Sequence, residues 1–80
     1  MFFVYFLRSL NSSDKTYVGF STDITQRLKI HNAGGSIHTQ KYKPWIMVSY
    51  LAFDCEEKAR DFEIYIKKGS GYAFAKKRIW

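Results

Sequence analysis

Three stretches of the chain carry the apolar, aromatic and β-branched residues that are typical of β-strands. Residues 2–7 form an unbroken run of such residues, which predicts a central strand covered on both faces. Residues 16–20 and 45–53 form two further runs. Turn-forming residues at 11–14 separate the first two runs, so we expect these to pair as an antiparallel hairpin.

The expected hairpin brings two phenols together. If its ladder pairs Arg8 with Asp14, Tyr5 lies opposite Tyr17 on one face of the sheet. This register is a hypothesis, because the turn residues alone do not define it.

Start and stop signals of a helix follow the hairpin. Asp23 and Gln26, three positions apart, have the pattern of a capping box, and residues 33–35 contain the glycines that end a helix. The buried stripe of this helix consists of Ile24 and Leu28. Arg27 and His31 are one turn apart, so we expect them side by side along the border of the stripe.

A second helix is expected over residues 56–68, with Asp54 and Glu57 as its capping pair. Its inward stripe consists of Ala59, Phe62 and Ile66. Glu63 lies beside this stripe, which is an unusual place for a carboxylate. After a glycine-rich break, residues 72–80 are expected to form a short basic helix.

The order of these elements, β-β-α-β-α-α, predicts an α/β (α+β) fold in which helices flank a three-stranded antiparallel sheet. A length of 80 residues fits one domain spanning residues 1–80. Residues 36–43 are polar and basic with no hydrophobic periodicity, and we expect them to form a mobile surface loop.

The charge balance favours a polyanionic partner. The formal net charge is +6 and the isoelectric point is about 9.6, which should attract nucleic acid. The cations expected to contact it are Lys41, Lys43, Lys67, Lys68, Lys76, Lys77 and Arg78. A basic surface that only improves solubility is the alternative.

The single cysteine, Cys55, cannot form an internal disulfide and favours a reduced, cytoplasmic setting. The apolar start of the chain lacks the basic leader and the small-residue cleavage site of a signal peptide. No apolar run approaches the roughly 20 residues that span a bilayer. We therefore expect neither export nor membrane insertion.

Phosphodiester hydrolysis needs an activated water, a cation for the developing charge, a proton route and often a carboxylate-bound metal. Tyr5 or Tyr17 can orient or deprotonate water, and Arg27 can bind the phosphate. His31 can relay a proton, and Glu63 can hold a divalent cation such as Mg²⁺.

Each of these residues also has a structural interpretation. Aromatic residues such as Tyr5 and Tyr17 are common in strands, and Arg27 with His31 can be solvated surface. Glu63 can simply form an ion pair with Lys67, four residues later on the same helix.

The ordered set of these residues resembles the GIY-YIG nuclease superfamily. Phe3-Val4-Tyr5 and Tyr17-Val18-Gly19 are similar to its two motifs, and Arg27, His31 and Glu63 follow in the family's order. Nearly the whole chain takes part in the resemblance. The phrases His38-Thr39, Lys43-Pro44-Trp45 and Lys68-Gly69-Ser70-Gly71 are similar to those of small stand-alone bacterial members, which are related to the nuclease module of the repair protein UvrC.

The resemblance implies metal-dependent cleavage of a nucleic-acid phosphodiester, with Mg²⁺ or Mn²⁺ as cofactor. The preferred hypothesis is an endonuclease that acts on DNA in repair or recombination, and the sequence alone does not distinguish DNA from RNA. The resemblance also implies Tyr5 as the water-activating or water-orienting group with Tyr17 beside it, Arg27 as the phosphate ligand, and His31 as the histidine one turn later. Glu63 takes the place of the metal ligand.

The sequence departs from the family pattern at Phe3, which stands where the first motif has glycine. We expect this change to affect packing more than catalysis. Two alternatives stay open: a non-catalytic nucleic-acid-binding module with the same fold, and a protein-interaction domain that uses exposed aromatics such as Trp45 or Trp80.

Overall fold

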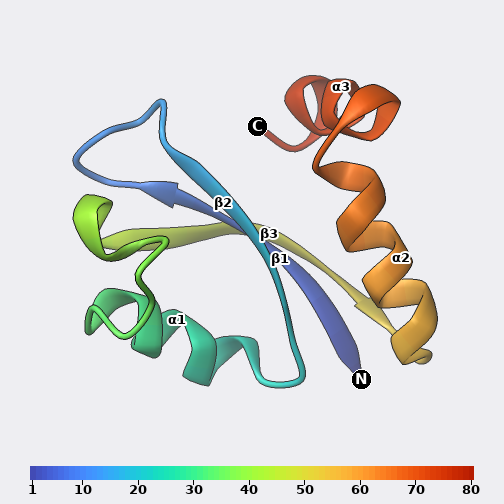
Figure 1. The fold of residues 1–80 in the computed structure, drawn as a ribbon, viewed down its shortest axis with the longest axis horizontal. Coiled ribbons are helices and arrows are strands. Elements are labelled where there is room, and N and C mark those ends of the chain that lie inside the picture. Colours follow the sequence, from blue (N-terminus) through green and yellow to red (C-terminus); the bar gives the residue numbers. More distant parts are fainter.

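A computed structural model describes residues 1–80, and its centre is a three-stranded sheet (Figure 1). The strands are β1 (Phe2–Ser9), β2 (Thr16–Ser21) and β3 (Trp45–Phe53). Their order in the sheet is β2-β1-β3, and both neighbouring pairs are antiparallel. The predicted central position of the first strand is confirmed.

The predicted hairpin register is wrong by two residues. Tyr5 lies opposite Gly19, and Arg8 lies opposite Thr16. The turn is longer than expected because the Ser9 hydroxyl accepts hydrogen bonds from the backbone N–H groups of Asn11 and Ser12, at 3.2 and 3.1 Å. A shift by an even number of residues keeps every side chain on its face of the sheet, so the two tyrosines still share a face.

Helix α1 (Ile24–Asn32) and a short 3₁₀ helix, η1 (Gln40–Tyr42), lie between β2 and β3. The predicted cap of α1 is confirmed, because the Asp23 carboxylate accepts a hydrogen bond of 3.0 Å from the backbone N–H of Gln26. The segment between residues 36 and 43 is more than a surface loop, since its Thr39 is fully buried.

Helices α2 (Glu56–Ile66) and α3 (Gly69–Arg78) follow β3. Asp54 does not cap α2 as predicted, because the chain is still extended at Cys55, which is the N-cap residue and makes no side-chain cap bond. Helix α3 begins three residues earlier than predicted. It starts within the glycine-rich break, where a Cβ on Gly71 would overlap the backbone carbonyl of Tyr65.

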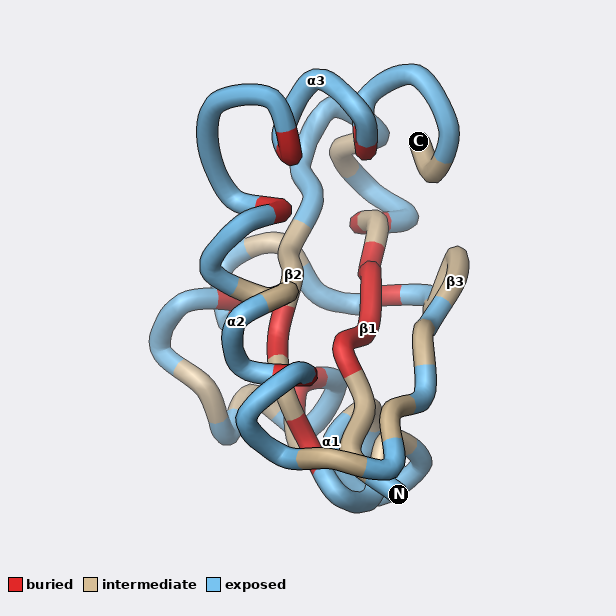
Figure 2. The backbone as a smooth tube through the Cα atoms, turned by 90° about the vertical axis from the view of Figure 1, so that its right-hand side faces the viewer, coloured by how far each residue is buried: buried red, intermediate tan, exposed pale blue.

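The helices cover opposite faces of the sheet, with α1 on one side and α2 and α3 on the other (Figure 1). Residues 4–7 of the central strand β1 are all buried, and Figure 2 shows burial along the backbone in red. Val4 and Phe6 pack toward α2 and α3 in an apolar cluster that includes Ala59, Ile66 and Ala75. Tyr5 and Leu7 form the other cluster with Trp45, toward α1. None of the helices combines the length and the hydrophobicity needed to cross a membrane.

Candidate active site

The side chain of Tyr5 lies across Gly19 on the neighbouring edge strand β2. Tyr5 is only 2% exposed, and a Cβ on Gly19 would overlap its phenol. Strand pairing places the two residues opposite each other. The glycine of the second motif therefore gives the tyrosine of the first motif the space in which it lies.

A buried chain of hydrogen bonds begins at the Tyr5 phenol. Tyr5 Oη is 2.8 Å from His31 Nε2, and His31 Nδ1 is 2.6 Å from Thr39 Oγ1. The Thr39 carbonyl in turn accepts a bond of 2.8 Å from the indole N–H of Trp45. All four residues are at most 3% exposed, so the phenol and the imidazole are held in fixed positions.

The amide side chain of Asn32 attaches α1 to the same strand. Its Oδ1 accepts a bond of 2.6 Å from the Trp45 backbone N–H, and its Nδ2 donates one of 3.1 Å to the Trp45 carbonyl. Asn32 follows His31 directly, so these two bonds fix the end of the helix that carries the imidazole.

Tyr17 completes an aromatic group around the imidazole. Its ring centre is 6.3 Å from that of Tyr5 and 5.0 Å from that of His31. Tyr17 is half-buried, whereas Tyr5 is buried. The predicted proximity of the two phenols is confirmed, with Tyr17 the one that is accessible from solvent.

Burial raises the pKa of the Tyr5 phenol above its usual value, and the neighbouring Tyr17 raises it further. The positive charge of Arg27 opposes these effects, and the negative charge of Glu63 adds to them. Burial also lowers the pKa of His31, and Arg27 lowers it further. At neutral pH the pair is therefore a protonated phenol beside a neutral imidazole. If the phenol donates to Nε2, the ring hydrogen lies on Nδ1 and points to Thr39.

Arg27 and Glu63 belong to helices on opposite sides of the sheet. Arg27 is exposed on α1, while Glu63 belongs to α2 on the other face. Their charges nevertheless both act on the Tyr5 phenol. Of the five candidate residues, Tyr5, Tyr17 and His31 lie together, and Arg27 and Glu63 come from helices on opposite faces of the sheet (Figure 1).

The predicted ion pair of Glu63 is also present, since Lys67 Nζ lies 2.9 Å from Glu63 Oε2. The Glu63 side chain is 20% exposed and that of Lys67 is 47% exposed, so the pair faces solvent and contributes little to stability. No cluster of three or more histidine, cysteine or acidic side chains is suited to hold a metal. Glu63 offers a single carboxylate.

The seven cations predicted to contact nucleic acid are all exposed. They form two separate groups along the chain, one around η1 and one at the end of α2 and in α3. The first group contains Lys41 and Lys43, and the second contains Lys67, Lys68, Lys76, Lys77 and Arg78. Only Lys67 bonds to a residue of the candidate site.

Phe3, the departure from the family motif, packs on Tyr50 of β3 with 5.8 Å between ring centres. Its ring thus lies toward the β3 edge of the sheet. The interpretation that this residue affects packing agrees with that contact.

Thr39, Asn32 and Trp45 were not among the candidate site residues, although they hold His31 in place. Thr39 lies in a polar segment whose pattern gave no sign of burial. The sequence singles out Thr39 only through the similarity of His38-Thr39 to small family members, and this similarity does not indicate where the side chain lies.

A three-stranded antiparallel sheet that brings two phenols and an imidazole together fits a nuclease-type catalytic domain. The chain belongs to the GIY-YIG family, because the model of the GIY-YIG catalytic domain matches residues 1–77. GIY-YIG domains are endonuclease domains that act on nucleic acid and generally depend on a divalent metal.

The relatives of this chain include UPF0213 proteins of Streptococcus pyogenes. Those of serotype M5 (strain Manfredo) and serotype M2 (strain MGAS10270) are each 41% identical over 61 residues. The match covers 74% of this chain and 66% of each relative, slightly less than two thirds of their length. The UPF0213 protein of serotype M3 (strain ATCC BAA-595 / MGAS315) matches to the same extent.

Proposed function

We propose that this domain is a metal-dependent endonuclease that hydrolyses phosphodiester bonds in DNA, with a place in repair or recombination. The observation that supports the proposal most is the contact of Tyr5, Tyr17 and His31, with Arg27 and Glu63 as the further members of the proposed site. These residues come from four different elements, two of which lie on opposite faces of the sheet. Packing alone does not require charged and phenolic groups at these positions.

Arg27 binds the scissile phosphate in this proposal. Its exposed guanidinium supplies a fixed positive charge close to the Tyr5 phenol, where negative charge develops as water attacks. Tyr5 or Tyr17 activates or orients the attacking water, and Tyr17 is the one of the two that is accessible from solvent. His31 Nε2, which is neutral at pH 7, accepts a hydrogen bond from the Tyr5 phenol and holds its hydroxyl in position.

Glu63 is the proposed ligand of Mg²⁺ or Mn²⁺. Mg²⁺ keeps several waters and commonly binds through one or two carboxylates together with substrate phosphates, so a single partly exposed carboxylate suits it. The bound cation would stabilise negative charge on the phosphate oxygens. Lys67 must leave Glu63 for this role, and their exposed ion pair is weak enough to permit it.

The test is cleavage of plasmid, branched and single-stranded DNA by the purified protein with Mg²⁺ or Mn²⁺. Glu63→Gln should reduce the rate by at least about a hundredfold, the effect expected from loss of a catalytic charge. Glu56→Gln is the matched control, because Glu56 forms the same type of ion pair with Arg60 on the same helix, at 3.0 Å. Equal rates for Glu63→Gln and the wild-type protein would contradict the proposal.

The bond between Glu63 and Lys67 favours one alternative, a nucleic-acid-binding module without catalysis. Filter binding across a salt series, with no product formed under any metal condition, would support this alternative. The free Cys55 supports a reducing, cytoplasmic setting, which stays a prediction.

A further inference from the structure

We propose that the pocket between β2 and the last two helices binds an unpaired nucleobase of the substrate strand, next to the phosphate that is cleaved. The proposal rests on the proposed nuclease function and adds a substrate requirement to it. The strand must present at least one base that is free of its partner and of its neighbours in the stack.

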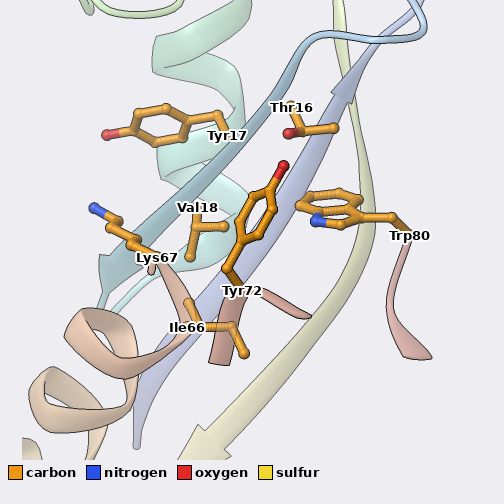
Figure 3. Close-up of a pocket in the computed structure, with 7 residues that line it drawn as sticks. All are labelled: Thr16, Tyr17, Val18, Ile66, Lys67, Tyr72 and Trp80. Atoms are coloured by element: carbon orange, nitrogen blue, oxygen red, sulfur yellow. The ribbon is translucent and has the colours of Figure 1, made fainter. Parts of the chain in front are cut away.

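The pocket has the size and lining of a base-binding site (Figure 3). It is an open hollow of about 260 Å³. Its lining consists of Thr16, Tyr17, Val18, Ile66, Lys67, Tyr72 and Trp80. Aromatic and aliphatic side chains suit the flat face of a base, and the hydroxyl and ammonium groups suit its polar edge.

One wall of the pocket is rigid and another is exposed. The Trp80 ring packs on Phe6 with 5.5 Å between ring centres, and the Arg8 guanidinium lies over it at 5.7 Å. The Trp80 carbonyl also accepts a bond of 3.0 Å from Arg8. Tyr72, from α3, is 55% exposed although it lines the pocket, which leaves much of its ring available for stacking.

The pocket adjoins the candidate active site through two shared residues. Tyr17 lines the pocket on the β2 side, and its ring, which Figure 3 shows directed away from Tyr72 and Trp80, has its centre 5.0 Å from that of His31. Lys67 also lines the pocket, and its ammonium group lies 2.9 Å from the Glu63 carboxylate. A strand whose phosphate is bound at Glu63 therefore has a neighbouring nucleotide close to the pocket.

The charges around the pocket match a polyanionic strand better than a neutral ligand. Residues 64–80 contain five cations and no carboxylate side chain. These cations are Lys67, Lys68, Lys76, Lys77 and Arg78. They can follow the phosphate backbone on either side of a bound base. Inside a duplex the bases are paired and stacked, so only an unpaired base can enter.

The test measures binding of a fluorescent single-stranded oligonucleotide by anisotropy in EDTA, where cleavage is absent. Tyr72→Ala should weaken binding about tenfold, and Tyr72→Phe should restore it, because stacking needs the ring and not the hydroxyl. Phe74→Ala is the matched control, since Phe74 is an exposed aromatic on the same helix that does not line the pocket. Binding to an intact duplex should be the same for Tyr72→Ala and the wild-type protein.

A second arm locates the base along the strand. An abasic site is moved through the oligonucleotide one nucleotide at a time, and one position should weaken binding to the wild-type protein about tenfold. The same abasic site should have no effect on Tyr72→Ala, because the two changes remove the same contact.

Equal losses for Tyr72→Ala and Phe74→Ala, or the same loss on duplex and single strand, would overturn the pocket proposal. Retained cleavage in that case would leave the nuclease function intact. Absence of cleavage by every variant, together with the expected binding pattern, would instead refute the nuclease function and keep the pocket as a base-binding site.

Discussion

The two faces of the sheet are built on different principles. Toward α2 and α3, Val4 and Phe6 pack in a cluster of apolar side chains. Toward α1, Tyr5 meets the imidazole of His31 and through it the hydroxyl of Thr39. The first face is stabilised by removal of apolar area from water, whereas the second must also satisfy each buried polar group. The candidate active site is on the polar face, which is therefore the face more sensitive to small chemical changes.

The apolar face should show the largest loss of stability. Phe6 is fully buried, so Phe6→Ala leaves a cavity and should lower the free energy of unfolding by about 3–5 kcal/mol. Urea denaturation measures this change. Phe74→Ala, which truncates an exposed aromatic, should change stability far less. Similar losses for both variants would mean that the apolar cluster does not dominate the stability of that face.

The second-largest loss of stability is expected when a methyl group is added at Gly19, on the polar face of the sheet. Because it would overlap the Tyr5 phenol, Gly19→Ala should destabilise the protein by about 1–3 kcal/mol and displace the phenol from His31. In a Tyr5→Ala background the same substitution should be nearly neutral, since the ring is gone. A double-mutant cycle measures the coupling. A penalty that persists without the ring would show that the strain lies in the backbone of β2.

Loss of a single hydroxyl should have a smaller effect. Thr39→Val keeps the shape of the side chain but leaves His31 Nδ1 without its partner, so we expect a loss of about 1 kcal/mol in denaturation experiments. The cleavage rate should fall as well, because the imidazole loses its fixed orientation. Thr22→Val, at an exposed position, is the control and should change neither quantity. Identical behaviour of the two variants would contradict a positioning role for Thr39.

The smallest and most gradual loss of stability is expected on acidification. Burial lowers the pKa of His31 below the ordinary value of 6.5, so the unfolded chain binds a proton more readily than the folded one. At higher pH His31 is neutral in both the folded and the unfolded chain, so its titration has no effect on stability. As the pH falls below 6.5, the unfolded chain takes up the proton first, and the free energy of unfolding should decrease. Melting temperatures between pH 8 and pH 5 test this. His31→Gln should lack that part of the slope, and equal slopes in both proteins would contradict it.

Local patterns predicted most of the fold because they report what each segment does by itself. The third strand was predicted at its observed bounds, and the Asp23 cap was predicted correctly. The errors fall where a neighbouring segment decides the outcome. Ser9 lengthens the hairpin turn by binding two backbone N–H groups, and Gly71 lets α3 start close against the end of α2.

The candidate site also contains features that local patterns predicted and features that depend on a neighbouring segment. Its tyrosines could be placed on one face from the two-residue period of a strand, because an even error in register leaves the faces unchanged. Arg27 and His31 could be placed together from the helical period. The depth of burial of His31 could not be predicted, since it depends on Thr39 and on the chain segment that carries it.

The elements, their order and the faces on which the phenols lie follow from local periodicities of two and of 3.6 residues, so they could be predicted from the chain. The position of Tyr5 across Gly19 and the bond between His31 and a threonine of a polar segment arise only when the elements pack together. These contacts join residues far apart in the chain. Their geometry arises from how whole elements pack, which no local period records.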